Sequence, residues 1–228
     1  MIIVTGGSGS LGRAIIKALE LEGLDGIIDW SLETGVDVSK PMSIAAAALR
    51  LPAGKPVSTL IHCAGTTKLN WFADITVEDW DNIIDTNAGG IFLVTKALLH
   101  RLRGGTILTI ASDAARKPMT NSLAYNASKA AAVMMAAQLH RELHDTHQIT
   151  SFSISPGKIA GTNMSSYVDK VVPGLRGWTP EYAQEYQLRS LAAGEEINLE
   201  TLAEFIAFIL STKDRHIFFG GKDLPYGG

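Results

Sequence analysis

Short apolar runs alternate with longer segments of helical periodicity along most of the chain. The runs predict strands at residues 2–5, 26–29, 57–62, 106–111, 149–154 and 216–219. Helices are predicted at residues 11–21, 42–51, 77–84, 88–102, 124–143 and 199–210, the second with Ser39 as its N-cap and Pro41 just inside. This alternation is typical of a parallel sheet covered on both faces. We expect residues 1–228 to form one doubly wound α/β domain, with about seven parallel strands flanked by helices.

Residues 158–198 lack the periodicity of the rest and are rich in Gly, Pro, Tyr and Trp. Long irregular segments in compact domains are often functional lids, so we expect this segment to cover a substrate. Its aromatic residues fit two interpretations equally well. In the first, they pack on an apolar or ring-containing substrate; in the second, they cover the edge of the sheet. The residues are Tyr167, Trp178, Tyr182 and Tyr186.

Composition excludes several classes of protein. The net charge is -3 and no basic block stands out, so neither nucleic acid nor a membrane is an expected partner. No apolar run approaches the ~18–20 residues of a membrane helix, and the start does not resemble a signal peptide. The one cysteine, Cys63, excludes an intrachain disulfide. We expect a cytoplasmic protein with no metal site.

A glycine-rich turn joins the first predicted strand to the first helix. It contains G-x-G-x-x-G at Gly7, Gly9 and Gly12, and glycines three apart at Gly6, Gly9 and Gly12. Glycine permits a tight turn, close approach of the backbone to a pyrophosphate, and close packing of the helix on the sheet. The strand–turn–helix context is the one this motif requires. The turn therefore predicts a Rossmann-type dinucleotide site.

Asp29 ends the second predicted strand, 17 residues after Gly12. This is close to the ~20-residue spacing of the acidic residue that accepts from a ribose hydroxyl. A carboxylate there repels the extra phosphate of NADP. Asp29 thus favours NAD, with NADP left open.

Tyr125 and Lys129 lie four residues apart at the start of the long predicted helix, on one face. A cation beside a phenol favours the phenolate and lowers the phenol pKa from ~10. Such a tyrosine serves as a general acid or base near neutral pH.

Together with the glycine turn, this pair resembles the short-chain dehydrogenase/reductase family. Ser112 lies thirteen residues before Tyr125, after a buried strand-like run. Further resemblances, in the family's order, are Asp37-Val38, Cys63-Ala64-Gly65, Asn87 and Pro156-Gly157. The resemblance extends over nearly the whole chain.

The resemblance implies an oxidoreductase that transfers hydride between NAD(P) and a carbonyl or secondary alcohol. Tyr125 would exchange the proton, Lys129 would hold the nicotinamide ribose, Ser112 would bind the substrate oxygen, and Asn87 would hold a relay water. The implied cofactor contacts are Gly6, Gly9, Ser10, Leu11, Gly12, Asp29, Asp37, Val38, Ala64, Gly65, Tyr125, Lys129, Pro156, Gly157, Ile159 and Thr162. It also implies a homodimer or homotetramer, paired through helices around 90–103 and 125–144.

Several positions depart from the family pattern. Ser10 replaces a glycine of the usual turn, and the three-residue glycine spacing resembles a branch that contains sugar-nucleotide epimerases and dehydratases. An enzyme of that kind is one alternative, and a dinucleotide-sensing protein without turnover is another. His62-Cys63 also departs from the pattern, and we expect both residues to be packing residues. The substrate, a small molecule, is not identified.

Overall fold

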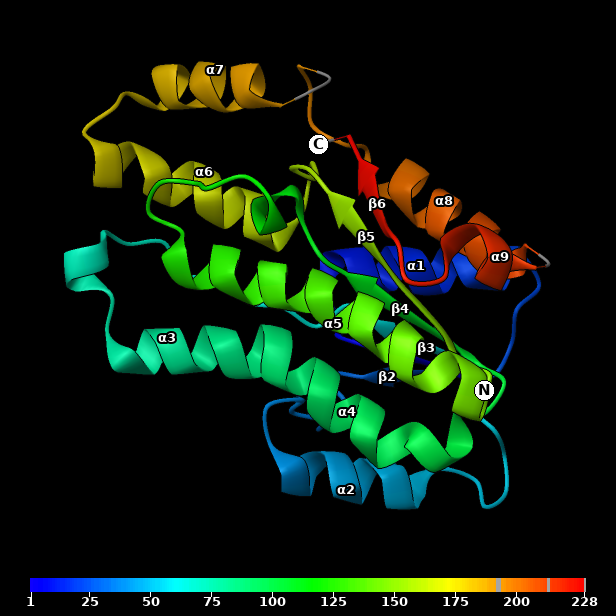
Figure 1. Cartoon of the computed structure of the whole chain (residues 1–228). Coiled ribbons are helices and arrows are strands. Elements are labelled where there is room, and N and C mark those ends of the chain that lie inside the picture. The colour runs from blue at the N-terminus through cyan, green and yellow to red at the C-terminus, as the bar shows by residue number, and fades with distance from the viewer. Residues whose placement is uncertain (192–193, 213, 228) are drawn as a thin grey trace.

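The computed structural model describes residues 1–191, 194–212 and 214–227. Its sheet has the strand order β2-β1-β3-β4-β5-β6 (Figure 1), with every neighbouring pair parallel. The strands are β1 (Ile2–Thr5), β2 (Ile27–Trp30), β3 (Thr59–His62), β4 (Thr106–Ile110), β5 (Thr150–Pro156) and β6 (Asp223–Tyr226). All carboxyl ends therefore lie at one edge, and the order reverses between β1 and β3. Ligands of open α/β sheets bind at such a point.

Helices cover both faces of the sheet, as expected. They are α1 (Ser10–Leu21), α2 (Pro41–Arg50), α3 (Val77–Ile84), α4 (Gly90–Leu98), α5 (Leu123–His147), α6 (Asn163–Arg176), α7 (Pro180–Ser190), α8 (Leu199–Ser211) and α9 (Arg215–Phe219). Residues of α1 and α8 share one core cluster with the sheet, and residues of α2 and α4 share another. In Figure 1, α6 and α7 lie together, away from α2. None of the described helices is long and apolar enough to cross a membrane.

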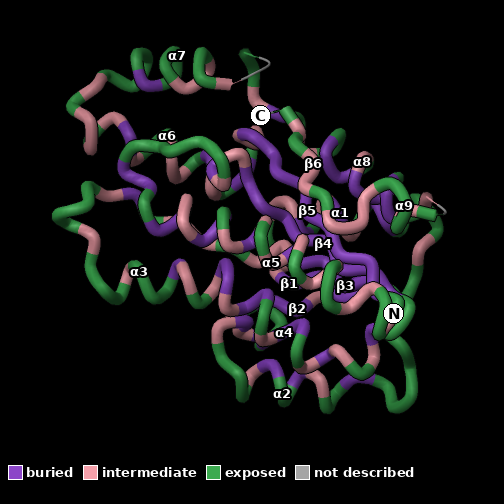
Figure 2. Tube along the Cα trace, viewed as in Figure 1, coloured by how far each residue is buried: buried purple, intermediate pink, exposed green. Residues whose placement is uncertain are grey.

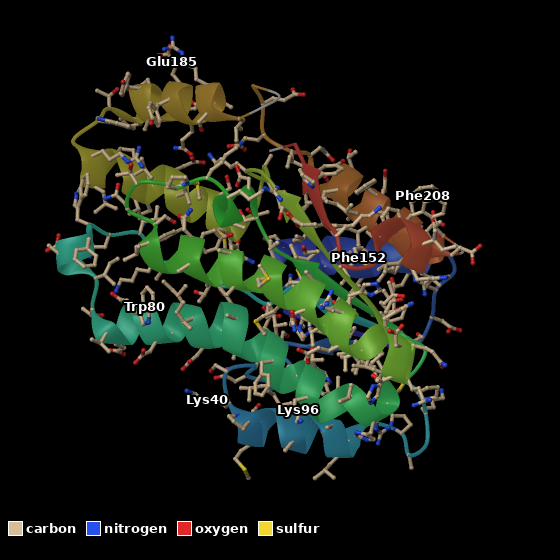
Figure 3. All side chains as sticks on the ribbon, in the orientation of Figure 1. Lys40, Trp80, Lys96, Phe152, Glu185 and Phe208 are labelled. Carbon is tan, nitrogen blue, oxygen red and sulfur yellow. The ribbon has the colours of Figure 1, made fainter. Side chains whose placement is uncertain are left out.

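Strands β1, β3, β4 and β5 are buried along their whole length, because helices cover both faces of the sheet. In β1, Ile2 and Val4 belong to the cluster with α1 and α8, whereas Ile3 belongs to the cluster with α2 and α4. Figure 2 shows the buried residues concentrated along the strands and the exposed residues on the outer helices. Phe152 lies among the strands and is fully buried, whereas Phe208 projects from the outside of α8 (Figure 3).

The glycine turn is compressed between β1, α1 and the chain that follows β3. Gly6 has φ +66°, which favours glycine, and a Cβ there would lie 2.7 Å from the Cα of Ala64. A Cβ on Gly12 would lie 2.2 Å from the carbonyl oxygen of Gly6. Both distances are too short for non-bonded atoms, so this packing requires glycine.

The described sheet has six strands, fewer than the seven or so expected. The chain after β2 turns tightly: the amide of Val36 donates to the carbonyl of Ser31, and that of Gly35 to Leu32. The next helix, α2, starts at Pro41. A further parallel strand needs a crossover of about a dozen residues or more, and this segment is too short for one.

Two local predictions near helix ends are wrong. Residues 216–219 form α9, and the last strand is β6. The ring of Phe219 packs 5.6 Å from that of Phe152 in this helical conformation. Ser39 does not cap α2, which has Lys40 at its N-cap. Instead Ser39 donates from its amide and hydroxyl to Asp37 Oδ1, at 2.9 and 2.7 Å.

The segment 158–198 is not irregular, because most of it forms α6 and α7. Thr162 caps α6 and Thr179 caps α7, each accepting from an amide three residues on. Pro173, inside α6, obscured the helical pattern, since proline usually ends helices. Residues 192 and 193 of the segment lie outside the described residues.

We expect Gly12→Ala to weaken dinucleotide binding at least about tenfold and to lower the free energy of unfolding by about 1–3 kcal/mol, because the new methyl group overpacks the turn. Calorimetric titration and chemical denaturation measure the two effects. Gly174→Ala is the matched control: it adds a methyl within α6, where no atom lies within 4 Å. Equal effects of both substitutions would contradict the packing argument.

Candidate active site

A cavity of about 590 Å³ opens at the carboxyl edge of the sheet. Its wall contains thirteen of the residues expected at the site. They are Gly6, Gly9, Ser10, Leu11, Gly12, Gly65, Ser112, Tyr125, Lys129, Pro156, Gly157, Ile159 and Thr162. The other five do not line the cavity; they are Asp29, Asp37, Val38, Ala64 and Asn87. The cavity thus joins the glycine turn to the tyrosine–lysine pair.

Tyr125 lies in the first turn of α5 and is 9% exposed. Burial raises the pKa of Tyr125 to about 12; the nearby Ser112 hydroxyl opposes the rise and the Asp113 carboxylate adds to it. The prediction that Lys129 lowers the pKa of Tyr125 is therefore wrong for the protein without a bound ligand. The penalty of burying a phenolate exceeds the stabilisation from its neighbours.

Lys129 is 6% exposed, and its Nζ donates to the carbonyl of Ile110, at the end of β4, over 2.8 Å. The same Nζ lies 5.7 Å from the centroid of the Tyr125 ring. Burial lowers the pKa of Lys129 to about 8. A small change of pH near neutrality therefore changes the charge beside Tyr125.

Ser112 follows β4 by two residues and is 8% exposed. Its hydroxyl donates to Asp113 Oδ1 and accepts from the amide of Ala114. The hydroxyl is thereby fixed at the cavity wall, beside Tyr125.

Asn87 lies in a π-helical turn, Asp85–Gly89, between α3 and α4. Its Nδ2 donates to the carbonyl of Thr66 and to the hydroxyl of Ser128, and its Oδ1 accepts from the amide of Thr66. Both side-chain hydrogens are thus engaged. A water held by Asn87 would have to bind through an oxygen, since no side-chain donor remains.

The dinucleotide end of the cavity is held together by Thr5, which sequence reasoning missed. Its hydroxyl oxygen accepts from the amides of Cys63 and Ala64, and the hydroxyl donates to the carbonyl of Ile61. These bonds hold the end of β1 against the chain after β3. Thr5 lies immediately before the glycine turn, and that position was the available signal.

Asp29 lies at the end of β2, beside the glycine turn. Its Oδ2 accepts from the hydroxyls of Ser8 and Ser31, whereas its Oδ1 is buried without a partner. A Cβ on Gly7 would lie 2.5 Å from that oxygen. This carboxylate oxygen has no partner and lies against a turn position that only glycine can occupy. It is therefore able to accept a hydrogen bond from a hydroxyl group of a ligand. The residues present therefore fit the ribose of a dinucleotide.

Asp37 and Val38 have other contacts. Asp37 Oδ1 is bonded within its own turn, to Ser39. Val38 is buried against α4, where a Cβ on Gly90 would lie 3.0 Å from its Cγ2.

Thr162 caps α6, and the amide of the next residue, Asn163, donates to the Ser10 hydroxyl. This last bond links the glycine turn directly to α6.

The loop that carries Ser112 is anchored by two residues that sequence reasoning missed. Asn126 Nδ2 donates to the carbonyls of Ala114 and Lys117, both at 2.6 Å. Asp223, in β6, forms an ion pair with Arg116. The position of Asn126 between Tyr125 and Lys129 was the signal for the first. No signal pointed to Asp223, because the last strand was predicted at residues 216–219.

His62 is a buried packing residue, as expected, whereas Cys63 is only partly buried and lines the cavity. His62 is buried with Nε2 2.9 Å from the Thr95 hydroxyl, and burial lowers its pKa to about 3. Burial raises the pKa of Cys63 to about 12. A thiol that stays protonated is a poor nucleophile.

Comparison with known proteins agrees with this geometry. The short chain dehydrogenase family model matches residues 32–172. The 2,3-dihydro-2,3-dihydroxybenzoate dehydrogenase of Escherichia coli is 30% identical over 190 residues, which are 80% of this chain and 74% of that enzyme.

Solved structures share the fold. An NAD+-bound xylitol dehydrogenase has a TM-score of 0.88 at 22% identity, and the match covers 100% of this chain and 97% of that one. An actinorhodin polyketide ketoreductase variant with NADPH has a TM-score of 0.85 at 24% identity, with 100% and 95% covered.

Proposed function

Because this chain belongs to the short-chain dehydrogenase/reductase family, and is thus an NAD(P)-dependent oxidoreductase acting on a CH–OH or C=O group, we propose that Tyr125 is its proton donor and acceptor. The observation that carries this proposal is that Tyr125, Ser112 and Lys129 share one cavity wall with the glycine turn. A bound nicotinamide supplies or accepts the hydride.

Each residue of the site has a proposed part in the reaction. In reduction, Tyr125 donates its proton to the substrate oxygen. Ser112 holds that oxygen by a hydrogen bond, with its hydroxyl hydrogen turned from Asp113 to the substrate. Lys129 stabilises the phenolate left behind and holds ribose hydroxyls. Asn87 holds a water that donates a hydrogen bond to one of its oxygens. This water links Lys129 to a source of protons. Positioning and a matched proton donor are what the protein contributes.

NAD is the proposed cofactor, with NADP as the alternative. The buried, unpartnered Oδ1 of Asp29 supports a ribose hydroxyl at this position. The proposed contacts are those that line the cavity, with Asp29 and Ala64 beside them. Asp37 and Val38 are also proposed as cofactor contacts, and Asp37 Oδ1 already accepts from Ser39.

Further proposals concern the protein as a whole. Residues 1–228 act as one domain in which 158–198 cover the substrate. Exposed apolar side chains on the helices expected to pair support a homodimer or homotetramer: Phe92 on α4 is 57% exposed and Met134 on α5 is 67% exposed. A cytoplasmic location remains our expectation. The epimerase and dinucleotide-sensor alternatives are disfavoured, since the dehydrogenase relatives match over most of the chain.

Tyr125→Phe is expected to reduce turnover at least about a hundredfold, because it removes the proton donor, while cofactor affinity stays within about threefold. Steady-state kinetics and calorimetry measure the two. Tyr226→Phe, in β6, is the control and keeps its turnover, because the Tyr226 ring packs against Phe205 and is not part of the described cavity wall. If Tyr125→Phe retains most activity, the proton-donor assignment is wrong.

The rate of carbonyl reduction is expected to fall as the pH rises through about 8. Lys129 loses its charge first, because its pKa of about 8 lies below that of Tyr125, about 12. Above that pH the phenolate left by Tyr125 has no cation beside it. The measurement is kcat/KM at saturating cofactor between about pH 6 and about pH 10. A profile that is flat across this range would contradict the role of Lys129.

Asp29→Ala is expected to shift the ratio of NADPH to NADH affinity at least about tenfold toward NADPH, because a repulsive carboxylate is removed. Calorimetric titrations with each cofactor measure the ratio. Asp25→Ala, at the exposed start of the same region, should leave the ratio unchanged. An unchanged ratio in Asp29→Ala would remove Asp29 from the ribose site.

A further inference from the structure

Arg176, the last residue of α6, lies in the cavity wall with its guanidinium held in a fixed orientation. Its Nε donates to Oδ1 of Asn121 and its Nη2 to the carbonyl of Thr120, both at 3.0 Å. The rings of Trp178 and Tyr186 lie 4.8 and 5.7 Å from its Cζ. Sequence reasoning did not select this residue.

The guanidinium of Arg176 has no carboxylate partner among the described residues. Every ion pair between described residues is formed by another lysine or arginine. Its Nη1 makes no hydrogen bond there, and one hydrogen of Nη2 is also free. The two rings lie on one side of the group, since their own centroids are only 4.8 Å apart. Because Nε and one hydrogen of Nη2 are engaged, the free donors lie along the edge formed by Nη1 and Nη2. That edge is the part of arginine that binds two oxygens of a carboxylate or phosphate.

The other cations of the described cavity wall are already engaged. Lys158 pairs with Asp169 and Glu196, Lys117 lies 3.9 Å from Asp113, and Lys129 donates to a carbonyl. Arg176 and Lys129 are therefore the cations of the described wall without a carboxylate partner, and Lys129 already has a proposed part in the reaction.

Neighbouring groups are also donors without acceptors. Asn121 is 7% exposed and its Nδ2 has no partner, while its Oδ1 accepts from Arg176. Ser122 is 4% exposed and its hydroxyl has no partner. Buried donors without acceptors destabilise a protein by about 1–3 kcal/mol each. Two buried polar groups next to Arg176 thus lack hydrogen-bond partners among the described residues.

We infer that Arg176 binds an oxyanion on the substrate, a carboxylate or a phosphate, and that the enzyme therefore acts on an anionic ketone or alcohol. This inference rests on the proposed function. Arg176 is bonded to residues 120 and 121, which lead through Ser122 into α5 and Tyr125. An anion held there would fix the substrate relative to the proton donor, and such orientation lowers the barrier of the reaction.

The test compares ketones that differ in charge. With the preferred cofactor, kcat/KM is measured for acetoacetate against ethyl acetoacetate, and for dihydroxyacetone phosphate against dihydroxyacetone. At least one anion should be preferred over its neutral counterpart by about tenfold or more. The pair that shows the preference distinguishes a carboxylate site from a phosphate site.

Arg176→Gln should lower that preference at least about tenfold, and Arg176→Lys should restore part of it, since the charge returns without the planar group. Arg189→Gln, which removes an exposed arginine paired with Glu185 on α7, should not change the preference. If the anion and its neutral counterpart lose rate equally in Arg176→Gln, Arg176 is structural and the inference is wrong.

Binding separates this inference from the proposed function. Calorimetry first tests NADH and NADPH with the wild type, and no binding of either overturns the proposed function. Where a cofactor binds, each anion is titrated into that complex. A complex that neither binds an anion nor prefers one in turnover overturns the inference alone.

Discussion

The hydrogen bond from the buried ammonium of Lys129 to the carbonyl of Ile110 organises the active site. A charge removed from water needs a close polar partner, so this bond holds α5 against the carboxyl end of β4. Ser112 follows Ile110 by two residues, and Tyr125 lies one turn before Lys129 on the same helix. One electrostatic requirement therefore brings a proton donor, a hydroxyl and a cation to the same cavity wall. The neighbouring Ser128 accepts from Asn87 and ties the π-helical turn to the same helix.

The wall of the cavity is formed by segments that lie far apart in the sequence. The Ser10 hydroxyl accepts from the amide of Asn163, which joins the glycine turn to the start of α6. At the other end of α6, Arg176 donates to the segment that leads into α5. The helix expected to cover the substrate is thus bonded to both the dinucleotide end and the catalytic end.

Two differences between the structure and the sequence predictions, the number of strands and the pKa of Tyr125, have physical causes within this chain. The short, tightly turned connection after β2 leaves no length for a crossover, and the described sheet ends at β2 on that side. The pKa of Tyr125 rises because desolvation of a phenolate outweighs its one favourable neighbour. Lowering of this pKa therefore depends on more than the sequence spacing of Tyr125 and Lys129.

The sequence by itself determined the features that arise from local spacing. The apolar strand runs predicted the doubly wound sheet, the glycines predicted the compressed turn, and the interval between Tyr125 and Lys129 predicted their common face. Only the tertiary structure decided the contacts between distant segments. It placed Asp223 against Arg116 across 107 residues, made residues 216–219 helical against Phe152, and left the guanidinium of Arg176 without an anion among the described residues. Such contacts depend on how helices and strands pack in space, and a periodic pattern along the chain carries no record of that packing.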